Sequence, residues 1–116
     1  MKDVIKVIIK RPREKVGHTD DIGNSLFCLQ RFVDGPIETI TMANGNVIIC
    51  NEEARIRNMD YNFTYCYPYT IANGDVITMQ MPIFGPVVIC GVDGEDFTDL
   101  SISLKEWSDL LHNWGN

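Results

Sequence analysis

Aliphatic residues recur at every second position near the start of the chain, which is the pattern of a β-strand. One parity of residues 2–10 alternates lysine with aliphatic side chains, and the other parity holds Ile5, Val7 and Ile9. Val and Ile favour the pleated surface of a sheet. We therefore predict a strand over residues 2–10, ending at Arg11-Pro12, and a polar loop over residues 11–23.

A helical spacing of apolar residues follows this loop. Asn24 or Ser25 can cap the helix at its start. Its apolar face is Leu26, Leu29 and Val33. Asp34-Gly35 ends the helix, and we expect Gly35 in the left-handed conformation.

A second helix is predicted near the other end of the chain. Ser103 and Glu106 have the spacing of a capping box, and Gly115 ends the pattern. The apolar face of this helix is Leu104, Trp107, Leu111 and Trp114.

The rest of the chain has the pattern of strands joined by turns. Asn44-Gly45 is the strongest signal for a two-residue hairpin, and it joins predicted strands at residues 36–42 and 46–51. Further strands are expected at residues 61–70, 74–81 and 87–92, with a turn at 82–86 and a loop or one helical turn at 52–60. These elements predict one α+β domain over residues 1–116, with a mostly antiparallel sheet of five or six strands packed against two helices.

Two stretches of the chain are similar to each other. Residues 35–50 run from glycine through Thr41-Met42 to an aliphatic triplet and Cys50, and residues 74–90 run from glycine through Thr78-Met79 to a second triplet and Cys90. They are either two unrelated hairpins built from common sheet residues or the halves of a pseudo-two-fold sheet.

Length and composition are those of an ordinary globular domain. The chain has 116 residues, of which 45% are hydrophobic and 22% charged, so it can fold without disulfides or metal. No apolar run reaches the roughly 20 residues that cross a bilayer, and the charged start lacks the features of a signal peptide. We expect a soluble, cytoplasmic protein.

Charge divides the chain unevenly. Residues 1–15 hold six basic and two acidic side chains, a sum of +4, so the remainder of a chain with net charge −6 carries −10. An acidic body repels nucleic acid, which is bound by clustered Lys and Arg. We therefore expect no direct nucleic-acid binding. The lysines of residues 2–10 are interpreted as protection of an exposed edge strand.

Groups that could carry catalysis or bind metal are few. The cysteines lack the close pairs of a zinc site, so free thiols are expected at Cys28, Cys50, Cys66 and Cys90. The acidic run at residues 93–99 lacks the glutamate that closes a calcium loop, because Leu104 stands at that position. His18 and His112 lie in no nucleophile or metal motif, and no glycine-rich nucleotide motif is present. We expect a protein that is not an enzyme and has no cofactor.

The most unusual segment is residues 61–69, where an aromatic side chain occupies every second position: Tyr61, Phe63, Tyr65, Tyr67 and Tyr69. In a strand these residues would line one face. Pro68 lacks a backbone N–H, which places the strand at a sheet edge. The row is either a core-facing strand or a recognition surface for a protein or a stacked base.

A second candidate site follows the hairpin, where two carboxylates lie near two guanidinium groups: Glu52, Glu53, Arg55 and Arg57. They could act as acid and base, but adjacent glutamates on an extended chain point to opposite sides. A solvated cluster of ion pairs is the other interpretation.

Three strings resemble an uncharacterised family: FVDGPIE at residues 32–38, VIICNEE at 47–53 and GVDGEDFTDL at 91–100. This is a domain-of-unknown-function family of small proteins encoded by bacteria, phages and integrative mobile elements, and the resemblance covers residues 27–111. The family usually continues after Asn-Glu-Glu with Gly and a Leu-Pro-x-Asn stretch, where this chain has residues 54–62. The resemblance implies no activity, only a mobile-element setting in which many small proteins bind host proteins.

Together these features predict a small non-enzymatic protein of phage or mobile-element type that binds a host protein through the tyrosine strand. The first alternative is a nucleotide or nucleotide-signal binder, with tyrosines stacking the base and Arg31, Arg55 and Arg57 near the phosphates. A small enzyme of unknown reaction is the second. Because residues 61–70 hold no charge to protect an edge, we also predict a homodimer that pairs this strand with its copy.

Overall fold

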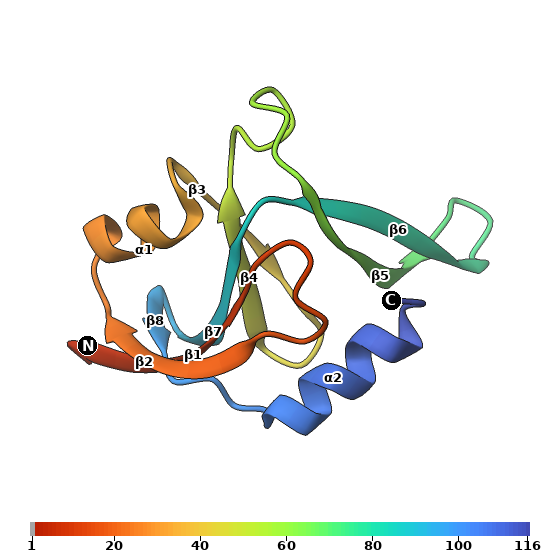
Figure 1. Cartoon of the computed structure of the whole chain (residues 1–116). Coiled ribbons are helices and arrows are strands. Elements are labelled where there is room, and N and C mark those ends of the chain that lie inside the picture. The colour runs from red at the N-terminus through yellow and green to blue at the C-terminus, as the bar shows by residue number, and fades with distance from the viewer. Residues whose placement is uncertain (1) are drawn as a thin grey trace.

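The computed structural model describes residues 2–116 and has an α+β fold, as predicted. The main antiparallel sheet has six strands: β1 (Val4–Lys10), β2 (His18–Gly23), β3 (Ile37–Thr41), β4 (Asn46–Asn51), β7 (Val87–Asp93) and β8 (Asp96–Thr98). A separate two-stranded sheet holds β5 (Tyr61–Thr70) and β6 (Val76–Phe84). Helices α1 (Leu26–Val33) and α2 (Leu104–Asn113) cover opposite faces of the main sheet (Figure 1). Neither helix, within the described residues, has the length and apolar character of a membrane span.

The main sheet has the strand order β2-β1-β7-β4-β3, with β8 paired to β7. The two aliphatic triplets lie side by side at its centre, where Ile48 pairs with Ile89 and Ile49 with Val88. Strand β1 lies between β2 and β7. The interpretation of residues 2–10 as an edge strand is therefore wrong, and β2 is the edge.

Two short strands are absent from the sequence prediction. The predicted loop at residues 11–23 contains β2, whose segment HTDDIG buries only Ile22. This polar strand forms because its backbone pairs with β1 along its whole length, from Val4↔Gly23 to Ile9↔His18. Strand β8 likewise forms by pairing with β7 across a tight turn, with Asp93 opposite Asp96.

Both helices begin at the predicted caps. The Ser25 hydroxyl accepts a hydrogen bond from the Cys28 N–H at 3.1 Å. Ser103 and Glu106 form the complete capping box, with bonds of 3.0 and 3.1 Å. At the end of α1, Asp34 takes the αL conformation with φ 63°, one residue earlier than predicted, and Gly35 follows it with a positive φ of 154°.

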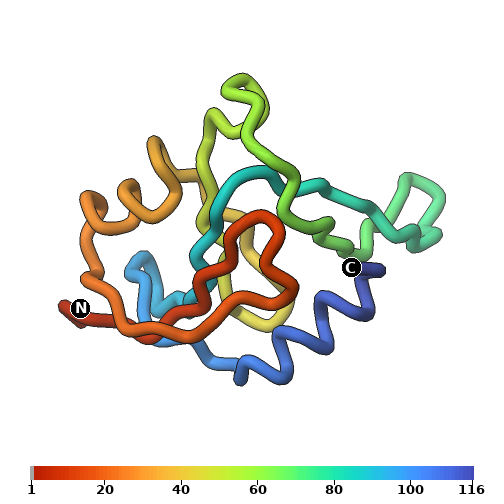
Figure 2. Tube along the Cα trace, viewed as in Figure 1, coloured from red at the N-terminus to blue at the C-terminus, as the bar shows by residue number. Residues whose placement is uncertain are grey.

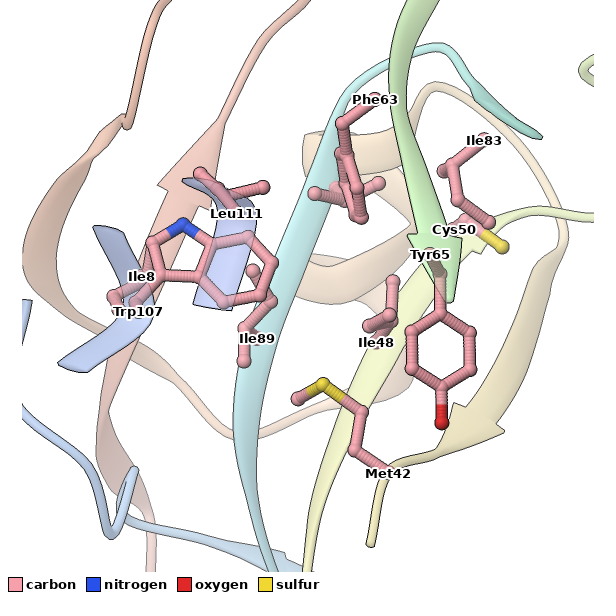
Figure 3. Packing of buried hydrophobic residues seen from close by; sticks show 11 residues of the cluster. Ile8, Met42, Ile48, Cys50, Phe63, Tyr65, Ile83, Ile89, Trp107 and Leu111 are labelled. Atoms are coloured by element: carbon pink, nitrogen blue, oxygen red, sulfur yellow. The ribbon is translucent and has the colours of Figure 1, made fainter. Parts of the chain in front are cut away.

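The main sheet has a hydrophobic core on each face. On one face, Leu29 and Val33 of α1 pack against the aliphatic side chains of β1, β4 and β7. On the other face, Trp107 and Leu111 of α2 pack with the sheet and with the inner end of β5 (Figure 3). There the Phe63 ring lies edge-on to Trp107, with 5.5 Å between centroids. This aromatic contact fixes the base of the second sheet against the first.

Strands β5 and β6 form a ribbon, residues 61–84, that extends beyond the main sheet (Figures 1 and 2). Strand β6 continues through residues 82–84, where we predicted a turn, and the turn to β7 is confined to Gly85-Pro86. Because β6 pairs with β5 whereas β7 pairs with β1 and β4, residues 74–90 do not form a hairpin. The interpretation of residues 74–90 as a second hairpin is therefore wrong.

A different internal repeat lies in the two hairpin loops. Residues 41–48 (TMANGNVI) and 70–77 (TIANGDVI) share the pattern Thr-x-Ala-Asn-Gly-x-Val-Ile. In the first loop the Met42 N–H donates to the Asn46 carbonyl at 2.8 Å, and in the second the Ile71 N–H donates to Asp75 at 2.9 Å. The glycines have φ of 84° and 92°, as this three-residue loop requires. The loop at Asn44-Gly45 thus has three residues rather than two, and the chain forms the same loop again in the ribbon.

Candidate binding surface

The aromatic row of β5 runs from the core out to an exposed surface. Phe63 and Tyr65 are 1% and 6% exposed, Tyr67 is half-buried, and Tyr69 is 53% exposed. The Tyr65 ring stacks on Tyr67 with 5.3 Å between centroids. The inner part of the row therefore belongs to the core, and its outer part faces solvent.

Strand β6 supplies the other half of this surface. Tyr67 pairs with Met79 and Tyr69 with Ile77, and residues opposite each other in an antiparallel pair project from the same face. Ile77 is 42% exposed and Met79 37%. These four residues, Tyr67, Tyr69, Ile77 and Met79, are called the ribbon face below.

The ribbon has almost no charge. Asp75, in the loop at its tip, is the single charged residue between positions 61 and 84. Exposed strands are normally kept apart from other proteins by charged side chains. An apolar surface without such a border is typical of a contact surface.

Tyr61 lies outside this row, although the sequence pattern places it there. A β-bulge shifts the register between Tyr61 and Phe63. The Tyr61 hydroxyl lies 2.6 Å from Thr64 Oγ1, and its ring is edge-on to Phe84 at 5.9 Å. The expectation that five aromatic residues share one face is therefore wrong for Tyr61.

A groove of about 420 Å³ separates the ribbon from edge strand β3. The main sheet contributes Glu38, Ile40 and Cys50 to it. The ribbon contributes Tyr67 and the inner half of β6 from Gln80 to Phe84. The segment after β4 contributes Glu52 and Arg55.

The four charged residues predicted as one cluster are divided by the structure. Glu52 and Arg55 line the groove, whereas Arg57 pairs with Asp34 at 3.1 Å and Glu53 lies outside the groove. Over residues 2–116, no ion pair joins any of the four to another. The ion-pair cluster interpretation is therefore wrong.

The arginines predicted for phosphate binding also lie apart. The Arg55 guanidinium lies 5.2 Å from the centre of the Phe84 ring, at the groove. Arg31 lies over the Phe27 ring of α1, at 5.7 Å. The groove thus combines one arginine with the carboxylates of Glu38 and Glu52, which does not favour a phosphate.

Asn51 joins two of the segments around the groove through its side chain. The sequence pattern predicts no role for this residue. Its Nδ2 donates to the Val33 and Asp34 carbonyls, both at 3.0 Å, and its Oδ1 accepts from the Glu53 N–H at 2.6 Å. The buried side chain thereby ties the end of α1 to the segment that carries Glu52 and Arg55. An asparagine that ends a run of aliphatic residues is the sequence signal that could have indicated this role.

All four cysteines are free, as predicted. Burial raises the pKa of the Cys90 thiol to about 12, and burial together with the Glu38 carboxylate raises that of Cys50 to about 11. Both thiols stay protonated near neutral pH, and a protonated thiol is a poor nucleophile. Although Cys50 lines the groove, it therefore contributes an apolar wall.

Of the remaining candidate residues, Asp99 serves the fold. The hydrogen bond from the Lys2 ammonium lowers the pKa of the Asp99 carboxyl, and the Lys6 N–H, which donates to Asp99 Oδ1 at 2.9 Å, lowers it further. His18 and His112 are both exposed, one on β2 and one on α2. In the described chain, no group of three His, Cys, Asp or Glu side chains gathers as a metal site would need.

Comparison with known proteins gives one result. A family model described as a domain of unknown function, DUF3846, matches residues 5–112 and so covers nearly the whole fold, including the ribbon and the groove. No curated protein and no solved structure matches the chain.

Proposed function

We propose that this chain, which belongs to the DUF3846 family of unknown function, is a non-enzymatic protein that binds another protein through the ribbon face. In a mobile-element setting the partner would be a host protein. The ribbon face is an exposed apolar surface that the packing of the fold does not require.

The observation that carries the proposal is the different burial of the two hairpin repeats. In the first repeat, Val47 and Ile48 are 3% and 0% exposed. In the second, the equivalent Val76 and Ile77 are 66% and 42% exposed. Full burial of such a side chain contributes about 1.5–3 kcal/mol. Ile77, which lies on the ribbon face, leaves part of this stabilisation unused, and a partner that covers the face would gain it.

The chemistry of the ribbon face suits a protein partner. Tyrosine and methionine are enriched at protein interfaces, the first as a rigid amphipathic anchor and the second as an adaptable one. The inner residues Phe63 and Tyr65 are packed in the core and hold the ribbon in place. A rigid base with an open apolar end can bind without a large loss of conformational entropy.

The nucleotide alternative has weaker support. Of the three arginines proposed for phosphates, only Arg55 lines the groove, and Glu38 and Glu52 line it as well. Two carboxylates beside one guanidinium repel an anionic ligand. Tyr67 is half-buried by the core rather than free to stack on a base.

Site-specific photo-crosslinking tests the proposal. A photoreactive phenylalanine at Tyr69 should cross-link one protein in the cells that naturally hold this gene, in a 1:1 ratio. Phe27 is the matched control, because it is 66% exposed but lies on α1, on the other face of the main sheet. If Tyr69 captures only what Phe27 also captures, the ribbon face is not a specific contact surface.

A further inference from the structure

The two outer edges of the ribbon differ in how their main-chain groups are hydrogen-bonded. On the edge of β5, the Asn116 side chain accepts the Thr64 N–H at 2.9 Å and donates to the Thr64 carbonyl at 2.8 Å. Further along the same edge, Pro68 has no N–H to offer. The edge of β5 is thus occupied at Thr64 by its own chain and lacks a donor at Pro68, and Figure 2 shows the C-terminal residues beside it.

The edge of β6 follows from the same hydrogen bonds. Because both main-chain groups of Thr64 point away from β6, its partner Pro82 also faces outward. Outward and inward residues alternate along a strand. Gln80, Thr78 and Val76 therefore direct their N–H and C=O groups away from β5.

These outward groups are unprotected. Throughout residues 2–116, no backbone or side-chain hydrogen bond reaches the main chain of Val76, Thr78 or Gln80 from outside the ribbon. Proteins normally protect such an edge with lysine, proline or a bulge, and β6 has its only proline at Pro82, which lines the groove. The open edge is three outward residues long and leads into the groove.

From this geometry we infer that the partner adds an extended peptide segment to the outer edge of β6. The inference rests on the proposed function and specifies how the partner binds. Alternate side chains of the added strand lie beside Ile77 and Met79 and extend the ribbon face, so they are aliphatic or aromatic. Beyond Gln80 the segment enters the groove, where the two carboxylates of Glu38 and Glu52 outnumber the one guanidinium of Arg55 and favour a lysine or arginine. The charge of −10 on residues 16–116 acts in the same sense.

A proline at position 78 tests the strand addition. Thr78→Pro removes an N–H that points away from β5. The hydrogen bonds between β6 and β5 stay intact, because Thr78 is paired with Pro68, which has no N–H, and the two strands exchange no bond at this position. Thr78→Val is the matched control, which keeps the N–H and changes the side chain. A library of displayed random linear peptides is selected on the full wild-type chain, and the affinity of the enriched peptides is measured by fluorescence anisotropy.

We expect enriched peptides with alternating apolar residues and a basic residue. Thr78→Pro should weaken their binding by at least about tenfold, and Thr78→Val by less than about twofold. Methylating the peptide nitrogens that face β6 should abolish binding to the wild-type chain, a result that does not depend on how the proline variant folds.

Other outcomes overturn the inference. They are the absence of enriched peptides, or enriched peptides that bind Thr78→Pro and wild type equally. A dimer in sedimentation velocity that Thr78→Pro converts to monomer would assign the edge to a second copy of the chain. In each case, a specific cross-link from Tyr69 that survives Thr78→Pro would leave the proposed function standing and remove only the strand addition.

Discussion

Lys10 and Asn62 show how far a single residue can depart from its sequence pattern. Lys10 shares the parity of Lys2 and Lys6, yet it is 2% exposed. Its ammonium donates to Asn62 Oδ1, and Asn62 Nδ2 donates to the carbonyls of Lys10 and Gly85 at 2.9 and 2.8 Å. Burial lowers the pKa of Lys10. This contact joins β1 to the base of the ribbon.

A double-mutant cycle measures this contact. Asn62→Leu should lower the free energy of unfolding by about 3 kcal/mol, because the buried ammonium then keeps only the Asn62 main-chain carbonyl, at 3.4 Å, and the Phe63 ring as partners. Lys10→Met should cost about 1–3 kcal/mol. The double variant should lower the free energy of unfolding by less than the sum of the two single changes. When both side chains are replaced, neither is left buried without the other. Additive costs in urea denaturation would show that the two side chains do not stabilise each other.

No local pattern could have predicted this pair. The sequence pattern places Asn62 on the polar face of its strand, but the bulge directs its amide side chain into the core. Lys10, the partner of this amide, is 52 positions away along the chain. Helix caps are different, because Ser25 and Ser103 bind groups only three residues away. The sequence therefore predicted the caps and missed the buried lysine.

At the scale of elements, the two hairpins have one loop sequence and two environments. The Asn-Gly pair predicts a hairpin at residues 44–45, and the same pair at residues 73–74 indicates the second one, which the sequence analysis overlooked. The loop sequence does not indicate which of the two hairpins is buried by the other elements of the fold. That depends on β7, which lies beside β4 and not beside β6.

A pair of lysine substitutions at equivalent positions tests this difference. Ile77→Lys places a charge on an exposed surface and should change the free energy of unfolding by less than about 0.5 kcal/mol. Ile48→Lys places it in the centre of the core and should cost several kcal/mol or prevent folding. Chemical denaturation followed by circular dichroism separates the two. Equal destabilisation would mean that the ribbon face is covered within the folded protein.

Strands β2 and β8 mark the limit of patterning at this scale. Alternation identifies a strand when one face is buried, and β2 buries only Ile22. Strand β2 pairs with β1 through backbone hydrogen bonds, and these do not depend on the pattern of polar and apolar side chains. The central strands β4 and β7 were recognised because both of their faces are apolar.

At the scale of the whole molecule, the candidate site is assembled from distant segments. The fold class could be predicted from the order of elements, but the separation of the ribbon from the main sheet could not. That separation creates the groove, which brings Glu38 of β3 and Glu52 near Tyr67 and Gln80. The predicted homodimer through β5 stays a prediction, and in this structure its pairing edge is occupied at Thr64 by Asn116.

The central claim is that the ribbon face binds a protein partner. The most direct measurement is isothermal titration of the protein cross-linked from Tyr69, once purified, into the wild-type chain and into Ile77→Lys. We predict 1:1 binding to the wild type and a loss of at least about tenfold in affinity for Ile77→Lys, because the lysine must be buried at the contact. A partner that binds Ile77→Lys as tightly as the wild type would contradict the claim.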